Sequence, residues 1–476
     1  MQQYLTHMMM PNAPRLLKWL FHSYSSTTIP TTTTNNMMMM MKLSDQQQQV
    51  LNAISNGQSV FITGSAGTGK TLLLLQAIQL LKQIHNPNRV FVTASTGVAA
   101  CALNGQTLHS FAGIGLGLGN QELLLRRVGS NKQSAERWRS VAALVIDEVS
   151  MISGELFDKL EHIAKKIRRS RPPWGGIQLI VSGDFFQLPP ILKSHSHSNS
   201  SLPVNVKEFA FEAKCWSSSF DLQVELTRVF RQSDAQFVNL LQRVRRGVRD
   251  GNVLQILRNC NSKPMNYSNL EVPRLYPRNE DVRRVNAEKL GGLGGEIVEY
   301  RAVDTGKEPW MRQLRQGIAP NELQICLGAR VMLIKNKNVE VGLVNGAVGT
   351  VTGFVETEKV RCPGVSSTGL LPRVKFDCGA EMVMEVERWD VMEGELVVAT
   401  RRQVPLILSW ALSVHKCQGM TLDVLHTDLS RAFGCGMVYV ALSRVRTLEG
   451  LHLSGFDASK IAANPKVLEF YQNTIS

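Results

Sequence analysis

The stretch from Gly64 to Thr71 reads GSAGTGKT, and it constrains this chain more than any other feature of the sequence. It is a complete G-x-x-x-x-G-K-[ST] pattern between an apolar run that predicts a strand (SVFIT) and an amphipathic run that predicts a helix (TLLLLQAIQLLKQI). Glycines in such a loop let backbone N–H groups surround a phosphate at the start of a helix. The flanking elements favour a phosphate-binding loop over a chance glycine-rich turn.

The residues of this loop predict how a nucleoside triphosphate and Mg²⁺ would be held. Lys70 would place a positive charge on the β- and γ-phosphates, and the Thr71 hydroxyl would ligate Mg²⁺. The other predicted phosphate contacts are the preceding six residues of the loop: Gly64, Ser65, Ala66, Gly67, Thr68 and Gly69.

Two adjacent carboxylates follow a second apolar run. ALVIDEVS predicts a buried strand that ends at Asp147 and Glu148. An NTPase needs one carboxylate to hold Mg²⁺ and another to activate the attacking water, and Asp147 and Glu148 suit these two roles. Adjacent acids can also form a surface turn. Their position downstream of a phosphate-binding loop favours the catalytic interpretation, with Thr71 and Asp147 as the metal ligands.

The remaining motifs favour ATP over GTP. Residues 336–339 read NKNV, which lacks the Asp of a guanine-binding NKxD motif, and no DxxG closely follows Asp147. Instead, LIVSGDFFQLPPI predicts a further strand ending near Asp184 and Gln187, where a polar side chain is suited to sensing the γ-phosphate.

Composition favours a polyanionic partner. The chain has 53 Lys and Arg against 39 Asp and Glu, a net charge of +14, and only three of the positive charges precede Asp45. Such an excess is typical of proteins that bind nucleic acid, although many basic proteins do not. The longest apolar stretch, residues 404–414, is too short to span a bilayer, which excludes an integral membrane protein. Eight scattered cysteines without a Cys-x-x-Cys pair indicate reduced thiols in an intracellular compartment.

Alternating strand and helix patterns predict an α/β fold with parallel sheets. After Asn345-Gly346, a turn signal, short alternating strands predict an antiparallel β insert, and the α/β pattern then returns. We expect a first α/β domain over residues 43–224, with a small helical or loop insert at about 113–139, and a second over 225–345 and 404–476, interrupted by the β insert at 346–403.

Residues 1–42 are expected to lie outside the folded domains. The first 44 residues contain no Asp or Glu and hold nine of the 18 methionines, a low-complexity composition that cannot bury a core. A mitochondrial or plastid transit peptide, a disordered leader, and a true start within Met37–Met41 all remain open.

Eight motifs in order resemble those of the petite integration frequency family of superfamily-one DNA helicases. They read LSDQQQQVL, GSAGTGKT, TASTGVAA with GQTLHSFAGIGLG, VIDEVSMISGELFDKLE, GDFFQLPP, ELTRVFRQ, LSVHKCQGMTLD and YVALSRVRTLEGL. The resemblance covers Leu43 to Leu453. The run VIDEVSMISGELFDKLE is specific, because the similar RecD-type helicases lack it. Two departures are Gln46, where the family usually has Glu, and Cys417, where it usually has Ser.

The resemblance implies two RecA-like P-loop motor domains that bind ATP and Mg²⁺, with an SH3-like barrel as the β insert. Gln47 would contact the adenine, and Gln187 would couple phosphate to DNA. Arg231 and Arg444 would be transition-state arginines supplied by the second motor domain, although a solvated surface charge is the ordinary role of one Arg in a basic chain. With Lys70 and Glu148, these three residues make up the predicted catalytic set.

The resemblance also implies a path for single-stranded DNA, which proteins hold by polar and basic groups with aromatic stacking. The predicted DNA contacts are Thr96, Gly97, Thr107, His109, His415 and Lys416. Phe111 is left open between a core residue and a DNA contact. The Arg-rich helix at 240–251 is expected to be a solvated face. Basic residues of the β insert that could contact phosphate are Lys359, Arg361, Arg373, Lys375, Arg401 and Arg402.

The function implied by the resemblance is an ATP-dependent 5′-to-3′ DNA helicase. It would translocate on single-stranded DNA and unwind duplex or structured DNA in repair, recombination and telomere or genome maintenance, in the mitochondrion, the nucleus or both. Expected partners are single-stranded and forked DNA, with no membrane, and a monomer is expected when the protein is free. The alternatives are a RecD-like motor of a nuclease complex and a nucleic-acid-binding NTPase switch that does not unwind.

Overall fold

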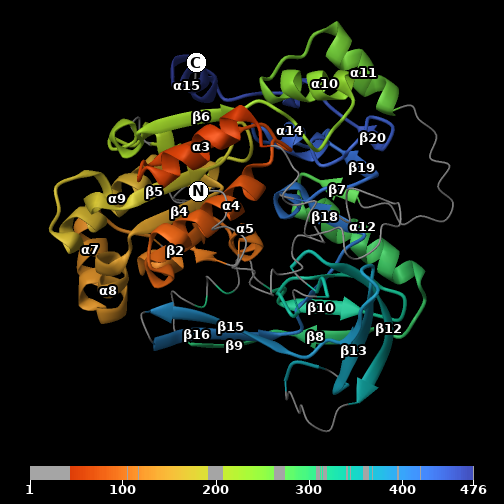
Figure 1. Cartoon of the computed structure of the whole chain (residues 1–476). Helices are drawn as coiled ribbons and strands as arrows, with labels where there is room; N and C mark the ends of the chain where they lie inside the picture. Colours follow the sequence, from red (N-terminus) through yellow and green to blue (C-terminus); the bar gives the residue numbers. More distant parts are fainter. Residues whose placement is uncertain are drawn as a thin grey trace, which may run out of the picture. The chain divides into compact units, whose positions relative to one another are not determined.

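The computed structural model describes residues 43–103, 105–115, 117–190, 207–261, 274–306, 311, 314, 319–338, 341–343, 345–356, 364–366, 368–393, 396–418 and 420–474. They form two compact units (Figure 1). The larger unit comprises the described residues of 43–287, 390–399 and 410–474, and the smaller comprises those of 288–389 and 400–409. The leader expected at 1–42 lies outside the described residues.

A six-stranded parallel sheet forms the first half of the larger unit. Its strand order is β3-β2-β4-β5-β1-β6. The strands are β1 (Val60–Gly64), β2 (Val90–Ala94), β3 (Gln106–Thr107), β4 (Ala143–Asp147), β5 (Gln178–Ser182) and β6 (Leu222–Leu226). Strand β5 lies between β1, which leads into the phosphate-binding loop, and β4, which ends at the Asp147-Glu148 pair. The segment that follows β5 therefore begins between the loop and this pair.

Helices cover both faces of this sheet, as its strands require. In β1, Val60 and Ile62 pack in one core with helices α3 and α4, whereas Phe61 packs in a second core on the other face with α9. Continuous apolar strands such as ALVI are typical of sheets buried on both sides. The helices are α3 (Asp45–Ser55), α4 (Lys70–Ile84), α5 (Gly97–Ala102), α6 (Leu108–Ala112), α7 (Gln121–Ser130), α8 (Lys132–Ser140) and α9 (Gly154–Arg168).

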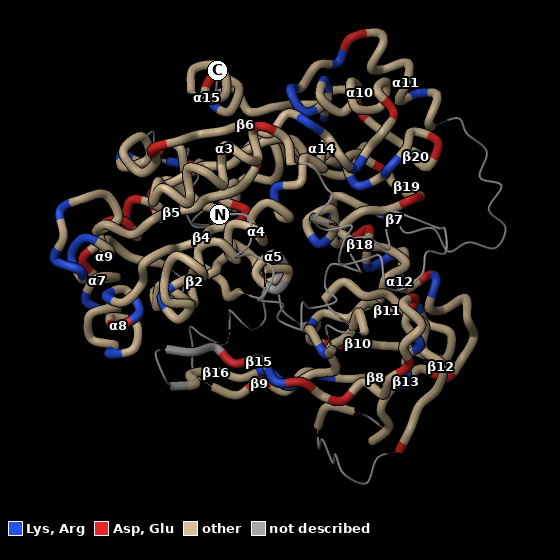
Figure 2. Tube along the Cα trace, in the orientation of Figure 1, with Lys and Arg blue, Asp and Glu red and all other residues tan. Residues whose placement is uncertain are grey.

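The segment predicted as a small insert contains helices α7 and α8. Both pack against α9, and Figure 2 shows Lys and Arg gathered on these three helices. The buried indole of Trp138 in α8 anchors the insert, since its Nε1 donates a hydrogen bond of 3.1 Å to the Ala112 carbonyl.

A second parallel sheet, with strand order β18-β7-β19-β20, completes the larger unit. Its strands are β7 (Arg274–Tyr276), β18 (Ala411–Ser413), β19 (Leu425–Asp428) and β20 (Leu451–Gly455). Its helices are α10 (Ala235–Arg245), α11 (Gly251–Asn261), α12 (Asn279–Gly292), which continues into the smaller unit, and α14 (Met437–Leu442). The two parallel sheets confirm the predicted α/β fold class.

The last described helix, α15 (Pro465–Thr474), packs with the first sheet. Val467, Phe470 and Tyr471 belong to the core beneath the first sheet, where the Phe470 ring stacks on Phe211 with centroids 4.4 Å apart. The sequence predicts that the second α/β domain extends to residue 476. In the structure, the chain returns at its end to the first sheet, because these apolar side chains complete a core there.

The smaller unit consists of β-sheets, and its antiparallel pairing confirms the predicted β insert. The sheets have the orders β10-β8, β14-β13-β12-β11-β17 and β15-β16-β9. Their strands are β8 (Val298–Arg301), β9 (Val303–Gly306), β10 (Glu322–Ile325), β11 (Arg330–Leu333), β12 (Val348–Glu356), β13 (Leu370–Phe376), β14 (Glu381–Val383), β15 (Glu387–Glu393), β16 (Leu396–Gln403) and β17 (Leu406–Leu408). The described residues of 390–399, in β15 and β16, are grouped with the larger unit.

The unit begins near residue 288 and is therefore longer than the insert expected at 346–403. The earlier strands β8 to β11 have only four residues each, too few to show a clear two-residue period in the sequence. None of the described helices of either unit is both long and apolar enough to cross a membrane.

Arg401 of the β insert cannot contact DNA phosphate in this structure, contrary to expectation. Its side chain is 1% exposed, and its Nε and Nη2 each lie 2.7 Å from an Asp304 carboxylate oxygen. Arg373 and Lys375 are exposed and Arg402 is half-buried, whereas Lys359 and Arg361 lie outside the described residues.

Candidate active site and nucleic-acid interface

The phosphate-binding loop joins β1 to α4, and its glycines adopt conformations that other residues rarely reach. Gly67 and Gly69 have φ values of 84° and 83°, in the left-handed region. A Cβ on Gly67 would lie 2.6 Å from the Cβ of Arg231. The loop therefore requires glycine for its backbone angle and for the close approach of Arg231.

The Lys70 side chain folds back over this loop. Its Nζ donates hydrogen bonds of 2.7 Å to the Gly64 carbonyl and 3.0 Å to the Ser65 carbonyl. Burial lowers the pKa of the Lys70 ammonium, and the carboxylates of Asp184 and Glu148 act in the opposite direction. Thr71 lies exposed in the first turn of α4.

Two side chains from the helices of the second half also reach the loop. Tyr439 in α14 accepts a 2.7 Å hydrogen bond from the backbone N–H of Ala66 through its hydroxyl. Gln242 in α10 donates through Nε2 to the Ser65 hydroxyl at 2.9 Å. Sequence reasoning missed both residues. The loop is therefore contacted by elements encoded about 175 and 370 residues further along the chain.

Asp147 and Glu148 lie at the carboxyl end of β4, as predicted. The Asp147 carboxylate is buried and accepts the Glu148 backbone N–H at 2.9 Å, and burial raises its pKa. Glu148 has a left-handed φ of 54°, an uncommon conformation for a residue with a Cβ.

The environment of Glu148 suits a general base. Burial raises the pKa of its carboxyl to about 7, and the neighbouring Asp147 carboxylate adds to the shift. Its Oε2 accepts a 2.9 Å hydrogen bond from Nε2 of Gln418, which follows β18. A base whose pKa lies near neutrality transfers protons efficiently at physiological pH.

Asp184 and Gln187 follow β5 and are both buried. The Gln187 Nε2 donates to Asp184 Oδ2 at 3.3 Å, so the residue predicted to sense phosphate is held by the carboxylate beside it. A Cβ on Gly436, just before α14, would lie 2.4 Å from the Phe186 carbonyl and 2.6 Å from the Gln187 carbonyl. The start of α14 therefore packs directly on this segment.

Arg245 neutralises Asp184. The Arg245 side chain is 2% exposed, and its Nη2 donates to Asp184 Oδ1 at 2.8 Å while Nη1 donates to Glu225 Oε1 at 2.9 Å. Although burial alone would lower its pKa, the Asp184 carboxylate raises the pKa of Arg245 well above its ordinary value. This corrects the expectation that the helix at 240–251 is only a solvated face. Arg245 is four residues after Leu241 in the buried stripe of α10, and that spacing could have revealed it.

Tyr471 of α15 completes the same buried network. Its hydroxyl lies 2.5 Å from the Thr63 hydroxyl in β1, accepts the Phe185 N–H at 3.3 Å and lies 3.4 Å from Asp184 Oδ1. Its ring packs on Phe186 with centroids 4.7 Å apart. The C-terminal helix thus contributes to the support of the segment that carries Gln187.

We predict that Arg245→Met lowers the stability of the larger unit by about 3–5 kcal/mol, because it leaves the fully buried Asp184 carboxylate without its charged partner. Urea unfolding followed by circular dichroism measures the effect. Arg246→Met is the matched control, since Arg246 is the exposed neighbour. An unchanged unfolding midpoint in Arg245→Met would contradict the assigned role, and adding Asp184→Asn should recover part of the loss.

Arg231 and Arg444, the two predicted transition-state arginines, meet at Ser443. Arg231 Nη1 donates to the Ser443 carbonyl at 2.9 Å, and Arg444 Nη2 donates to the Ser443 hydroxyl at 2.8 Å. Arg444 is buried just after α14, which ends at Leu442, and burial lowers its pKa while Tyr439 and Glu148 oppose that shift. The structure thus brings Lys70, Glu148 and Arg444 within electrostatic range of one another.

Gln47, the predicted adenine contact, lies in the first turn of α3. Its Oε1 accepts the Ser44 N–H at 3.0 Å in a capping box, which leaves its Nε2 directed to the region of Gly69. Gln46, the position that departs from the family pattern, instead joins α3 to the end of β6. Its Nε2 donates to the Glu225 carbonyl and its Oε1 accepts from the Thr227 N–H.

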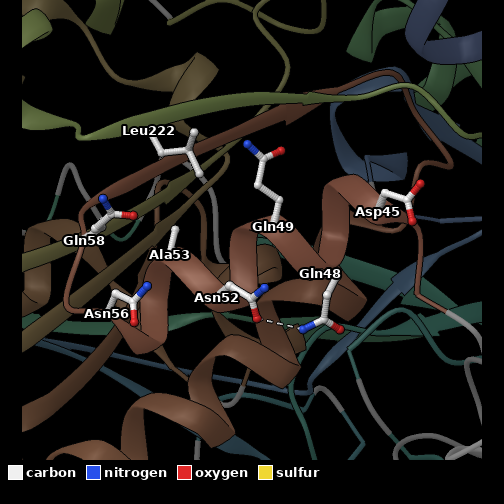
Figure 3. A pocket seen from close by; sticks show the side chains of 8 residues that line it. All are labelled: Asp45, Gln48, Gln49, Asn52, Ala53, Asn56, Gln58 and Leu222. Carbon is white, nitrogen blue, oxygen red and sulfur yellow. Dashed lines mark hydrogen bonds between the residues drawn. The ribbon is translucent and has the colours of Figure 1, made fainter.

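A further pocket lies beside α3 (Figure 3). Its lining is mostly polar: Asp45, Gln48, Gln49, Asn52, Ala53, Asn56, Gln58 and Leu222. None of the predicted catalytic residues contributes to it.

The predicted DNA contacts fall into two groups. Thr96 and Gly97 follow β2, Thr107 ends the adjacent strand β3, and His109 follows β3, so all four lie at one carboxyl edge of the first sheet. Thr107 caps α6 by accepting the Ser110 N–H, and burial lowers the pKa of His109. The second group, His415 and Lys416, follows β18 in the second sheet, with His415 half-buried and Lys416 exposed.

Phe111, which the sequence leaves open between a core residue and a DNA contact, is a core residue. Its side chain is fully buried, and its ring lies 5.0 Å from those of Phe91 and Trp138. It therefore supports α6, which carries His109, and offers no surface to DNA.

With this geometry established, comparison with known proteins identifies the family. The profile of the PIF1-like helicase family matches residues 42–253, and that of the DNA helicase Pif1 2B domain matches residues 313–354. The crystal structure of Pif1 helicase from Candida albicans superposes with a TM-score of 0.81 at 38% identity, covering 91% of this chain and 100% of that one. The chain belongs to the PIF1-like helicase family.

Two further PIF1-like proteins are informative. The ATP-dependent DNA helicase PIF1 of Danio rerio is 44% identical over 426 residues, which are 89% of this chain and 62% of that protein. This chain therefore spans about three-fifths of the length of such curated relatives. The crystal structure of Pif1 helicase from Bacteroides in complex with ADP-AlF3 and ssDNA superposes with a TM-score of 0.68 at 29% identity, covering 91% of this chain and 98% of that one.

Proposed function

We propose that this PIF1-like protein is an ATP-dependent DNA helicase that translocates 5′-to-3′ on single-stranded DNA and unwinds duplex or structured DNA. The observation that carries the proposal is that one site combines groups from both halves of the larger unit. The phosphate-binding loop and Glu148 follow strands of the first sheet, whereas Tyr439 in α14 and Arg444 just after it lie between β19 and β20 of the second sheet. Closure of such a composite site can couple ATP hydrolysis to movement of the two halves.

Each residue has a role in hydrolysis. Lys70 and the backbone N–H groups of its loop would hold the phosphates, and Gln47 would contact the adenine. Glu148 would accept the proton of the attacking water. Arg231 and Arg444 would stabilise the charge that develops on the transferred phosphoryl group.

Mg²⁺ fits the predicted ligands, Thr71 and Asp147, because both offer oxygen donors of the kind that this ion prefers. The buried Asp147 carboxylate, whose pKa burial raises, would also gain from a nearby cation. In the described part of the chain, no group of three or more His, Cys, Asp or Glu could hold a metal alone. Mg²⁺ is usually held by one or two protein groups together with substrate phosphates, where it supplies positive charge.

A RecD-like nuclease-complex motor and a non-unwinding switch are the competing functions. The family membership and the named relatives favour a Pif1-type motor over the first. A switch needs its nucleotide site to close only once. Arg231 and Arg444 both contact Ser443 beside the phosphate-binding loop, and this arrangement suits a motor whose site closes repeatedly.

We further propose single-stranded and forked DNA as partners, action as a monomer, and a role in repair, recombination and telomere maintenance in the mitochondrion, the nucleus or both.

Strand displacement by the purified protein tests the proposal. Duplexes that carry a 5′ or a 3′ single-stranded tail, one strand labelled, are incubated with ATP and Mg²⁺. We expect separation of the 5′-tailed substrate only. DNA-stimulated ATPase without strand separation would favour the switch, and separation of only the 3′-tailed substrate would overturn the polarity.

We predict that Arg231→Ala and Arg444→Ala each lower the DNA-stimulated kcat by about a hundredfold or more and change nucleotide affinity little, because charge beside the γ-phosphate matters most in the transition state. Steady-state ATPase with single-stranded DNA measures both quantities. Arg228→Ala is the control, since Arg228 is exposed and lies three residues before Arg231. An effect confined to KM would contradict the transition-state role.

A further inference from the structure

An exposed aromatic side chain lies on the larger unit between β19 and α14. Phe433 is 61% exposed, and no part of the nucleotide site described above uses it. A single exposed hydrophobic residue needs no explanation by itself. The arrangement of its neighbours, however, is that of a site for a flat ligand.

His415 and Arg278 flank the Phe433 ring. The rings of His415 and Phe433 are nearly parallel, with an angle of 23° between their planes and centroids 6.4 Å apart. The Arg278 guanidinium carbon lies 5.7 Å from the Phe433 centroid, and its Nε donates to the Arg431 carbonyl at 3.4 Å, which helps hold it there. One aromatic ring thus faces a second ring and has a cation beside it.

The spacing of the two rings is close to that needed for a nucleobase. Stacked bases are about 3.4 Å apart along a strand, so a base between two rings requires about 6.8 Å. The Phe433 and His415 centroids are 6.4 Å apart, which is close to this value, so a small rotation of the exposed Phe433 side chain would admit a base. Phe433 is 61% exposed, and its ring lies beside His415 and Arg278, both at the surface of this site.

We propose that Phe433 and His415 hold one nucleobase of single-stranded DNA between their rings, with Arg278 beside the adjoining phosphate. The inference rests on the proposed function and adds a base-stacking residue to it. Stacking on an aromatic ring is independent of sequence, because every base has a flat face, and it suits a motor that moves along any strand.

A nucleic acid suits this place better than an apolar protein partner. In the described residues, no carboxylate lies within ion-pair distance of Arg278, and the exposed Lys416 is adjacent to His415 in the chain. Arg431, also near, is paired with Asp281 at 2.6 Å. The charge that Arg278 and Lys416 place near Phe433 is therefore positive, which favours a DNA phosphate over an apolar protein surface.

The test compares binding of a dT oligonucleotide that carries one 2-aminopurine, whose fluorescence falls when the base stacks. We expect Phe433→Ala to weaken binding roughly 5- to 150-fold, the range for loss of one base–aromatic stack, and to reduce the quenching, while Phe433→Trp keeps both. Leu123→Ala is the matched control, since Leu123 is 56% exposed on α7. ATPase measured without DNA should be unchanged in Phe433→Ala.

An oligonucleotide with abasic residues separates stacking from general weakening. It should lower the affinity of the unmodified protein and have much less effect on Phe433→Ala, because that variant has already lost the stack. If the unmodified protein binds and unwinds DNA while Phe433→Ala binds as tightly and quenches as strongly, this inference is wrong and the proposed function stands. If the unmodified protein binds no single-stranded DNA, both are overturned.

Discussion

Lys70→Ala is expected to lower ATP turnover about a thousandfold or more and to abolish unwinding. In the structure, Lys70 is the side chain whose ammonium spans the loop, within 3.0 Å of the Gly64 and Ser65 carbonyls. An arginine finger, which also places positive charge on the transferred phosphoryl group, is worth about three to five orders of magnitude in kcat, and we expect an effect of similar size from Lys70. ATPase and strand-displacement rates measure the loss.

Lys82→Ala provides the matched control for Lys70→Ala. Lys82 lies in the last turn of the same helix, α4, and is exposed, so its removal takes away one charge without touching the loop. Single-stranded DNA binding should survive in both variants, because the predicted DNA contacts follow other strands. An ATPase rate within about twofold of the unmodified protein in Lys70→Ala would refute the phosphate assignment.

Glu148→Gln is expected to slow hydrolysis roughly a hundredfold or more while ATP still binds. The substitution keeps the volume of the side chain and an oxygen that can accept the hydrogen bond from Gln418, but it removes the base that accepts the proton of water. Single-turnover hydrolysis and binding of a fluorescent ATP analogue measure the two effects separately.

Glu155→Gln is the control for Glu148→Gln. Glu155 is an exposed carboxylate in the first turn of α9, where it pairs with Lys159 on the surface. Its replacement should leave hydrolysis unchanged. If Glu148→Gln loses ATP binding as well, Glu148 has a structural role, and the water-activating group must be another residue.

Local sequence patterns were sufficient for the fold class and for the order of the motifs. A buried parallel strand reads as a short apolar run, and a phosphate-binding loop must follow one directly, so SVFITGSAGTGKT and ALVIDE could be interpreted without a structure. The same reasoning was less successful for the β insert. Its first strands have four residues each and carry too little periodicity to mark where the smaller unit begins.

Contacts between distant segments could not be predicted in this way. Helical spacing puts Arg245 on the apolar stripe of α10, but nothing local shows that its partner is the buried Asp184. Likewise, nothing local shows that Arg401 pairs with Asp304 and does not contact phosphate. The aromatic residues Tyr439 and Tyr471 are further examples, since from near the end of the sequence Tyr439 reaches the phosphate-binding loop and Tyr471 reaches β1.

The sequence by itself determined the elements and the chemical groups, because helix and strand periods, the glycines of the loop and the Asp147-Glu148 pair are all encoded within a few neighbouring residues. Only the tertiary structure decided which of those groups meet. Folding places α14 against the segment that carries Gln187, joins Gln418 to Glu148, and sets Phe433 opposite His415. Such pairs depend on how whole helices and sheets pack, and their charges and rings become partners only when burial brings them together.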